Sequence, residues 1–441
     1  MKRIQIMLYK LKTILIGILI AVTGCSININ TKDLNVVPLE TDIPKQSAVI
    51  DNYHEFWSAI QHFDFDYINR YEVSDIEQNF VRGLELVMDG NYEDAEELYL
   101  TLFQSSDDSL FKENVAEILQ SLLAYHSDWE ALIMLDSQLP NGLDDQNTIG
   151  FARAFQKTDA ERYHFPDNIV ELPIELSISG VPMVEVLVNG KKQKFWIDTG
   201  AEMSVLSSDF AEFCGVENLS EDKIVLGTST EHTVESWPGI IKELRIGDLT
   251  VNNHPVIIID KKNLEFKLFK IIRLLKIDGI IGWNAIRNLH MEIDYKNGST
   301  TIKKPEKDFN PEPNFHYAGV PFLSLTDTLG IPFHFFFDTG ANKTSLYEPA
   351  LIKVDTTEIS HNRAIVGGAG GTQKIKQIVI PEVSLVLGNH RLNFGSMDIH
   401  GDGKHDFFYY DGVLGSDIAK FGTLILDFQN GRCELILPES D

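Results

Sequence analysis

The hydrophobic and polar positions along the chain follow three successive patterns. Residues 1–24 combine a basic start with a short apolar run from Ile14 to Val22. Over residues 51–165, Leu, Ala and aromatic residues recur with the spacing of amphipathic helices. From Ile169 onward, short β-rich runs alternate with Gly, Pro and Asn-Gly, which is typical of strands and tight turns. The pattern therefore predicts an α+β protein with several domains.

The helical region contains one clear pair of helices. One helix is predicted to end at Asp89-Gly90, and the next to begin at Asn91 with acidic residues in its first turn. A second pair is predicted across Leu110–Leu123 and Asp128–Leu135. The spacing resembles a tetratricopeptide-type (TPR-like) hairpin, and a plain helical bundle packed on the next domain is the alternative. Either arrangement predicts a spacer or a docking module for a protein partner.

The start of the chain has the features of an export signal. Its apolar run is too short to span a bilayer and ends in Val22-Thr23-Gly24-Cys25. This ending resembles a bacterial lipoprotein lipobox. The resemblance implies that residues 1–24 are a signal peptide and that Cys25 carries a palmitate-containing lipid. The polar composition of the following residues, which lack periodicity, predicts a tether over residues 25–50. The alternative is an ordinary signal peptide with an incidental cysteine.

Composition limits the remaining functions. The 65 acidic and 38 basic residues give a net charge of −27, which argues against nucleic-acid binding. Three cysteines provide no disulfide framework and no zinc ligand set, and Cys214 and Cys433 are predicted to be isolated thiols. The histidines, such as His232 and His254, lack metal-ligand spacing and are interpreted as solvated.

The β-rich region is an internal duplication. In each copy an apolar triplet precedes Asp-Thr-Gly-Ala, and Asp-Gly followed by two apolar residues and Gly comes later. The first copy contains Phe195-Trp196-Ile197-Asp198-Thr199-Gly200-Ala201 and Asp278-Gly279-Ile280-Ile281-Gly282. The second contains Phe335-Phe336-Phe337-Asp338-Thr339-Gly340-Ala341 and Asp411-Gly412-Val413-Leu414-Gly415. Each copy closes with a hairpin, predicted to turn at Asn297-Gly298 or Asn430-Gly431 in the type I′ form. The predicted units are residues 169–303 and 315–437, separated by the linker 304–314.

Each copy resembles a retropepsin-like aspartic protease lobe, and the pair resembles the bilobal pepsin plan. The resemblance implies two all-β lobes that bring together Asp198 and Asp338 as a catalytic dyad. It implies support of the dyad by Thr199, Gly200, Thr339 and Gly340. It also implies a mobile flap hairpin over the substrate in each lobe, with candidate residues Gly227, Thr228, Gly368 and Gly370. A plain long loop is the alternative for the glycine-rich segment of the second copy.

Two carboxyl groups that share one proton can activate water and protonate a carbonyl oxygen at once, and aspartic proteases are the best-known example of this effect. The resemblance therefore implies an aspartic endopeptidase that hydrolyses peptide bonds and needs no metal and no cofactor. Ala201 and Ala341 carry no hydroxyl that could donate to the dyad, so we expect raised pKa values and a pH optimum nearer neutral than that of pepsin.

The chain also departs from retroviral proteases. These pair an Asp, two residues beyond the motif glycine, with an Arg just after the distal glycine. Here the first positions hold Glu202 and Asn342, and the second hold Trp283 and Ser416. We therefore expect packing to replace that ion pair.

Three alternatives stay open. Each Asp could be a turn carboxylate that caps the local backbone. The chain could be a catalytically inactive protease-fold lipoprotein that binds peptides. It could also be an assembly factor built around its helices. The leading interpretation is an exported, membrane-anchored peptidase of the bacterial cell envelope. Ser26, in place of Asp after the lipobox cysteine, favours the outer membrane where one exists.

Overall fold

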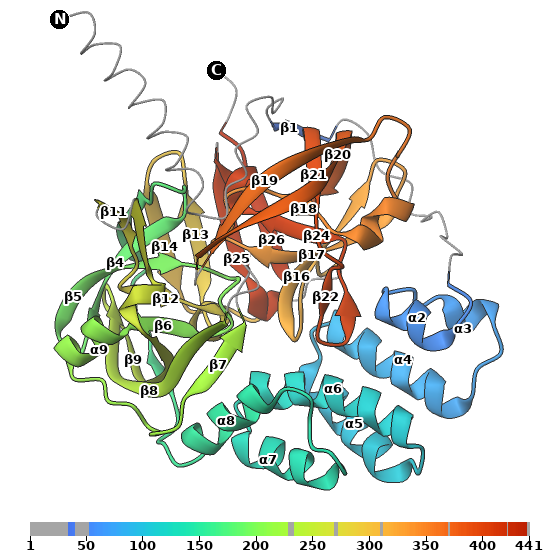
Figure 1. Ribbon diagram of the computed structural model, residues 1–441, viewed down its shortest axis with the longest axis horizontal. Helices are drawn as coiled ribbons and strands as arrows, with labels where there is room; N and C mark the ends of the chain where they lie inside the picture. The colour runs from blue at the N-terminus through green and yellow to red at the C-terminus, as the bar shows by residue number, and fades with distance from the viewer. Residues whose placement is uncertain are drawn as a thin grey trace, which may run out of the picture.

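A computed structural model of the chain describes residues 34–39, 53–227, 233–268, 272–308, 312–368, 371–420 and 422–438. An N-terminal helical region lies against two β-rich lobes (Figure 1). The predicted signal peptide and the lipobox residue Cys25 lie outside the described residues. Within the described part of the chain, no helix is long and apolar enough to cross a membrane.

The helical region runs as a series of antiparallel neighbours. Its helices are α2 (Phe56–Gln61), α3 (Tyr67–Arg70), α4 (Asp75–Met88), α5 (Tyr92–Ser105), α6 (Ser109–His126), α7 (Trp129–Gln138) and α8 (Gln146–Phe155). A capping box at Ser74 and Glu77 starts α4, and Gly90 after its end has φ of +74°. The predicted helix end at Asp89-Gly90 and the restart at Asn91 are therefore confirmed.

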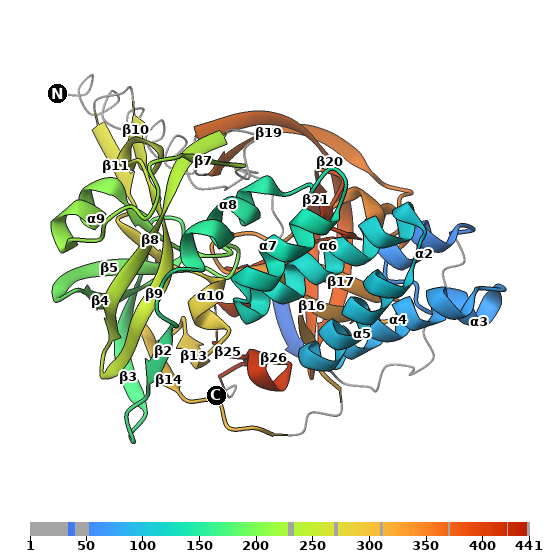
Figure 2. The same ribbon diagram turned by 90° about the horizontal axis from the view of Figure 1, so that it is seen from below.

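The helices share a hydrophobic core with the lobes. The Phe63 ring stacks on His334 at 4.1 Å and on Phe408 at 4.3 Å, both in lobe 2. The Tyr92 hydroxyl accepts a hydrogen bond from the Tyr317 backbone N–H (3.1 Å). Helix α8 contacts lobe 1, and Figure 2 shows the helices lying along both lobes. The region is thus a helical layer packed on the β lobes, and its TPR-like character stays a prediction.

Lobe 1 is a strongly bent sheet in which distant strands meet. Its strands are β2 (Arg162–His164), β3 (Val170–Leu176), β4 (Pro182–Val188), β5 (Lys191–Ile197), β6 (Ser204–Ser207), β7 (Ile224–Gly227), β8 (Thr233–Ile246), β9 (Leu249–Ile259), β10 (Glu265–Leu268), β11 (Ile272–Lys276), β12 (Gly279–Ile281), β13 (His290–Asp294) and β14 (Ser299–Lys303), with the helices α9 (Ser208–Cys214) and α10 (Trp283–Ile286). Strand β12 pairs parallel with β5 and antiparallel with β6. The later apolar-Gly segment is therefore inserted beside the strand that leads to the first Asp.

Lobe 2 repeats this plan. Its strands are β15 (Phe315–Ala318), β16 (Val320–Asp327), β17 (Pro332–Asp338), β18 (Ser345–Leu346), β19 (Ser360–Gly368), β20 (Gly371–Leu387), β21 (His390–Ile399), β22 (Lys404–His405), β23 (Phe408–Tyr409), β24 (Gly412–Gly415), β25 (Thr423–Asp427) and β26 (Arg432–Ile436). Strand β24 pairs parallel with β17 and antiparallel with β18, as β12 does with β5 and β6. The duplication read from the sequence is therefore a duplication of the fold.

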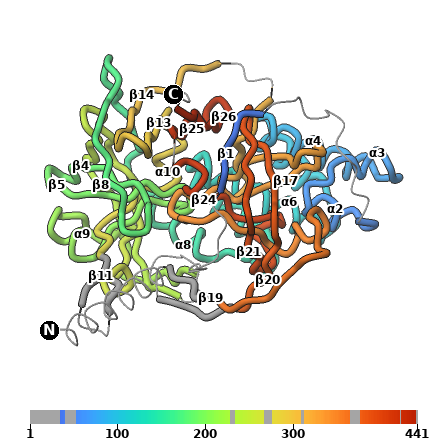
Figure 3. Tube along the Cα trace, turned by 90° about the horizontal axis from the view of Figure 1, so that it is seen from above, coloured from blue at the N-terminus to red at the C-terminus, as the bar shows by residue number. Residues whose placement is uncertain are grey.

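The closing hairpins of the two copies join the lobes. Strand β13 of lobe 1 pairs antiparallel with β25 of lobe 2, and β14 and β26 extend this sheet on either side (Figure 3). The predicted type I′ turns are wrong. Gly298 and Gly431 have positive φ, but the preceding Asn297 and Asn430 do not, because the loops are longer than two residues. The type I′ pattern occurs instead at Asn189-Gly190, between β4 and β5.

Two further expectations are corrected. Part of the predicted tether forms β1 (Asn35–Pro38), which pairs antiparallel with β21, because an edge strand presents free backbone donors and acceptors. His254, interpreted as solvated, is fully buried, and His232 lies outside the described residues. The expectation for Cys214 and Cys433 is confirmed, since both are free and buried.

Candidate active site

The first aspartate lies at the end of β5. Phe195 and Ile197 of this strand point into the core, and the Asp198 N–H donates to the carbonyl of Ile281 in β12 (3.1 Å). The inserted strand thus fixes the backbone just where the apolar run ends. Gly279 must be a glycine, because a Cβ there would lie 2.2 Å from the Phe195 ring.

The second aspartate is held in the same way. Asp338 ends β17 and lies opposite Gly415 of β24. Its carboxylate accepts hydrogen bonds from the N–H groups of Gly340 (2.8 Å) and Ala341 (3.0 Å). In lobe 1 the N–H of Gly200 donates to Asp198 (3.0 Å). In each motif, backbone N–H groups therefore donate hydrogen bonds to the carboxylate of the same motif.

The fold brings the two carboxyl groups face to face. A Cβ on Gly200 would lie 2.4 Å from the Asp338 carboxyl carbon, and one on Gly340 would lie 2.6 Å from that of Asp198. A hydrogen bond links the two carboxyl groups. Glycine is needed at both positions because the aspartate of the opposite motif fills the space that a side chain there would need. The two predicted dyad residues, 140 positions apart, thus meet at one point.

The surroundings of the pair favour a shared proton. Burial raises the pKa of Asp198 well above its usual value, and the nearby Asp338 raises it further. Burial also raises the pKa of Asp338, while its hydrogen bonds to Asp198 and to the backbone work against this shift. Both side chains keep partial exposure, so solvent reaches the dyad. The pair titrates as a unit, and one carboxyl group stays protonated at a pH where an isolated Asp would be ionised.

The two threonines lock the loops together. The Thr199 hydroxyl donates to the Phe337 carbonyl (2.8 Å) and accepts from the Thr339 N–H (3.0 Å). The Thr339 hydroxyl donates to the Ile197 carbonyl and accepts from the Thr199 N–H, both at 3.0 Å. Both threonines are fully buried. The predicted dyad support is thus a reciprocal set of four hydrogen bonds across the lobe interface.

Behind each aspartate loop lies a second layer that the sequence interpretation missed. In lobe 1 the Ser204 hydroxyl accepts from the Gly282 N–H (3.1 Å) and donates to Asn284 (3.1 Å). In lobe 2 the Thr344 hydroxyl accepts from the Gly415 N–H (3.1 Å) and donates to Asp417 (2.6 Å). The sequence does contain a signal for this layer, because Asn284 and Asp417 each lie two residues after the distal glycine of the repeat.

Lobe 1 adds a histidine to this layer. The Nε2 atom of buried His254 contacts the Ser204 hydroxyl at 2.8 Å, and its Nδ1 atom pairs with Glu161. Glu161 belongs to the segment that enters lobe 1 from the helical region. No motif spacing marks His254, because its partners lie 50 and 93 positions away.

Packing takes the place of the ion pair of retroviral proteases. Trp283 is fully buried, and its ring lies within 4.7 Å of Phe428 and 5.4 Å of Phe315. The Ser416 hydroxyl donates to the Ala341 carbonyl (2.9 Å). The Glu202 side chain reaches solvent, but protein atoms also surround it, among them Asp406 and Asp145. Desolvation by these atoms is the main cause that raises the pKa of Glu202 to about 7, and the charges of Asp406 and Asp145 add to it. The expected replacement by packing is confirmed at Trp283.

Each lobe has a hairpin at the position of the predicted flap. Gly227 ends β7 and pairs with Thr233 of β8, while Gly368 ends β19 and pairs with Gly371 of β20. Thr228 and Gly370 lie outside the described residues. The lobe 2 hairpin is longer, with nine residues in β19 against four in β7, and it extends from lobe 2 toward lobe 1 (Figures 1 and 2). A hairpin rather than a plain loop therefore carries these glycines.

Comparison with known proteins agrees with this geometry. Residues 184–285 match the family model of aspartyl proteases. This stretch covers β4 to α10 and includes Asp198 with its motif, whereas lobe 2 is assigned by its repeat of the same strand plan. Among solved structures, a retropepsin-like aspartic protease from Rickettsia conorii is 16% identical over 33% of this chain and 96% of its own, with a TM-score of 0.22. No curated protein matches the chain. The family match and the strand plan together support an aspartyl protease fold.

The described residues contain no group of three or more His, Cys, Asp or Glu side chains placed to hold a metal ion. The polar groups at the point where the two motifs meet include the two aspartates and the backbone N–H groups around them. Two carboxyl groups that share one proton are chemically suited to act as an acid and a base toward a water molecule.

Proposed function

We propose that the protein is an aspartic endopeptidase whose dyad is Asp198 and Asp338. The observation that carries this proposal is the contact of two carboxyl groups, one from each lobe, each seated against the glycine of the opposite motif. The ionised member accepts a proton from water as the water attacks the scissile carbonyl. The protonated member donates its proton to the carbonyl oxygen, which gives a gem-diol intermediate. When the C–N bond breaks, the carboxyl group that took the proton from water passes it to the leaving amine, and a gem-diol hydroxyl returns a proton to the other carboxylate.

The surrounding residues hold this geometry. The backbone N–H groups of Gly200 and Gly340 orient the carboxylates, and the threonine hydrogen bonds prevent the loops from separating. The two hairpins, β7–β8 and β19–β20, close over a bound peptide and exclude bulk water. The substrate is a peptide or an unfolded protein segment that fits between the lobes.

We also propose that the chain is exported and anchored to a membrane of the bacterial envelope through a lipid on Cys25. The lipobox-like sequence supports this proposal. Metabolic labelling with a palmitate analogue tests it, because label is expected on the wild type and not on Cys25→Ala.

Cleavage of a denatured protein separates the peptidase from an inactive peptide-binding protein. The wild type is expected to cleave it and to be inhibited by pepstatin, whereas Asp198→Asn is expected to bind peptides without cleaving them. A wild type that binds peptides but shows no cleavage between about pH 3 and 8, a range that brackets the raised carboxyl pKa values, would favour the inactive alternative.

A further inference from the structure

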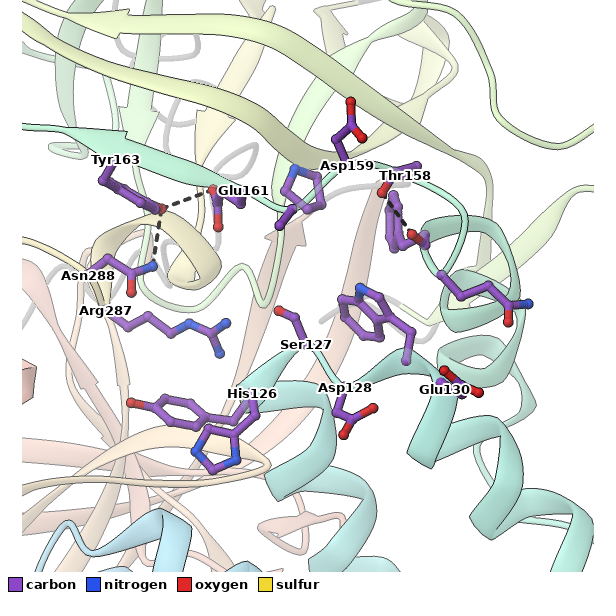
Figure 4. A pocket seen from close by; sticks show the side chains of 16 residues that line it. His126, Ser127, Asp128, Glu130, Thr158, Asp159, Glu161, Tyr163, Arg287 and Asn288 are labelled. Carbon is purple, nitrogen blue, oxygen red and sulfur yellow. Dashed lines mark hydrogen bonds between the residues drawn. The ribbon is translucent and has the colours of Figure 1, made fainter.

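A cavity of about 620 Å³ lies between the helical region and lobe 1 (Figure 4). Its walls come from the turn between α6 and α7, the end of α8, β2 and the segment after α10. Neither Asp198 nor Asp338 lines it. The cavity is therefore a site separate from the dyad, built where the helices meet a protease lobe.

A cation without a carboxylate partner projects into this cavity. The half-buried guanidinium of Arg287 lies over the Tyr125 ring, 4.6 Å from its centre. Among the described residues, no carboxylate lies within salt-bridge distance of it. Figure 4 shows the guanidinium pointing into the space between Glu161 and His126. A guanidinium with free donors, held against an aromatic face, is suited to bind an anionic group.

One acid that lines the cavity is already engaged. Glu161 pairs with His254 and accepts from the Tyr163 hydroxyl (3.1 Å). The Asn288 amide in turn donates to the Tyr163 oxygen (3.1 Å). Glu202 also feels the charge of Arg287, but among the described residues it forms no ion pair with it. Because Glu161, Tyr163 and Asn288 satisfy one another, the Arg287 donors stay available for a ligand.

The far side of the cavity has a different character. Trp129 and Phe155 provide an aromatic wall, with ring centroids 5.7 Å apart. The exposed acids Asp128, Glu130 and Asp159 surround this wall (Figure 4). The cavity thus has one positive end and one end that is both aromatic and negative.

We propose that this cavity binds the free carboxyl terminus of a peptide, with its carboxylate on Arg287 and a basic residue upstream near Asp128, Glu130 and Asp159. A single negative charge fits better than a phosphate, because a doubly charged group would be repelled more strongly by the surrounding carboxylates. Such a terminus exists on a peptidase product and equally on an intact protein partner. The shared chemistry is the α-carboxylate, and the site does not depend on catalysis at the dyad.

Calorimetric titration of the full chain tests this proposal. The probes are N-acetyl-Lys-Ala-Leu with a free carboxylate, the same peptide with a carboxamide, and inorganic phosphate. The chain carries Asp198→Asn to prevent cleavage. The free acid is expected to bind at least about tenfold more tightly than the amide, as the loss of a charge-assisted hydrogen bond predicts.

Variants locate the binding. Arg287→Gln is expected to abolish the difference between acid and amide, Arg287→Lys to keep part of it, and Arg162→Gln, an exposed arginine on β2 outside the cavity, to leave it unchanged. Ser127→Asp places a negative charge beside Arg287 at an exposed turn with φ of 58°, which Asp tolerates, and is expected to weaken only the acid.

Three results would overturn the proposal: equal binding of acid and amide, no binding of either up to millimolar concentration, or tighter binding of phosphate than of peptide. A second titration then distinguishes a partner from a product. It compares how tightly the Asp198→Asn chain binds intact proteins with basic carboxyl-terminal segments and how tightly it binds cleaved products of the same proteins.

Discussion

The two lobes build the same aspartate loop but support it with different side chains. In lobe 1 the layer behind the loop contains an amide, with Ser204 bonded to Asn284 and contacted by His254. In lobe 2 it contains a carboxyl group, because Thr344 bonds to the buried Asp417. In both lobes a hydroxyl accepts from the N–H of the distal glycine. Both lobes therefore provide a hydroxyl acceptor for that N–H, whereas the residue that the hydroxyl donates to differs between them.

The lobes differ outside this layer as well. The hairpin of lobe 2 is the longer one, and β21 of lobe 2 binds β1 from the start of the chain. The helical region contacts both lobes, and in lobe 1 the segment that follows it also supplies Glu161 to His254. The shared strands thus serve the dyad, while the differences lie where each lobe meets another part of the chain.

The two aspartates are expected to contribute equally to catalysis, so that substitution in either lobe should have the same effect. Asp198→Asn and Asp338→Asn are each expected to reduce kcat/KM by about 10²- to 10⁴-fold, because either change removes one half of a proton-sharing pair. Cleavage rates with a denatured protein substrate measure the loss. Retention of substantial activity by one variant alone would show that the lobes are not equivalent in catalysis.

The threonine hydrogen bonds should also act symmetrically. Thr339→Val leaves a buried carbonyl at Ile197 and a buried N–H at Thr199 without partners, and Thr199→Val does the same in reverse. Each variant is expected to lose about 2–5 kcal/mol of unfolding free energy. Urea unfolding measures this, with Thr→Ser as the control that keeps the hydroxyl. The double Val variant should lose less than the sum of the two.

His254 is expected to stabilise the aspartate loop of lobe 1 through contacts that differ from those in lobe 2. His254→Ala removes the partner of Ser204 and of Glu161 and is expected to cost about 1–3 kcal/mol of unfolding free energy. His361→Ala, an exposed position on β19, is the matched control and should have no measurable effect. Equal losses for the two variants would exclude a supporting role for His254.

The smallest effect concerns pH. The pKa of Glu202 is raised to about 7, so the folded chain holds this proton more tightly than the unfolded chain, and the contribution of Glu202 to stability falls as pH rises from about 4.5 to 7. Glu202→Gln should therefore raise Tm at about pH 8 and leave it nearly unchanged at about pH 4.5. The exposed Glu217→Gln is the control. If Glu202→Gln changed Tm by the same amount at both pH values, this assignment would be contradicted.

Much of the site was predictable because its signals are local and repeated. The two Asp-Thr-Gly-Ala motifs, the distal apolar-Gly runs and the closing hairpins each appear twice, so the repeat identified the strands and the aspartates. The strand β1 was missed because a segment without periodicity becomes a strand only when an edge is available. The turn types were wrong because loop length, rather than the Asn-Gly pair alone, selects the turn.

The sequence by itself determined the duplication, the helix ends and which two carboxylates would form the dyad, because each depends on residues that are neighbours in the chain. Only the tertiary structure decided that His254 lies behind the first loop and that Arg287 faces a cavity under the helices. Both depend on contacts between segments far apart in sequence, where burial and hydrogen-bond geometry, rather than local pattern, choose the partner.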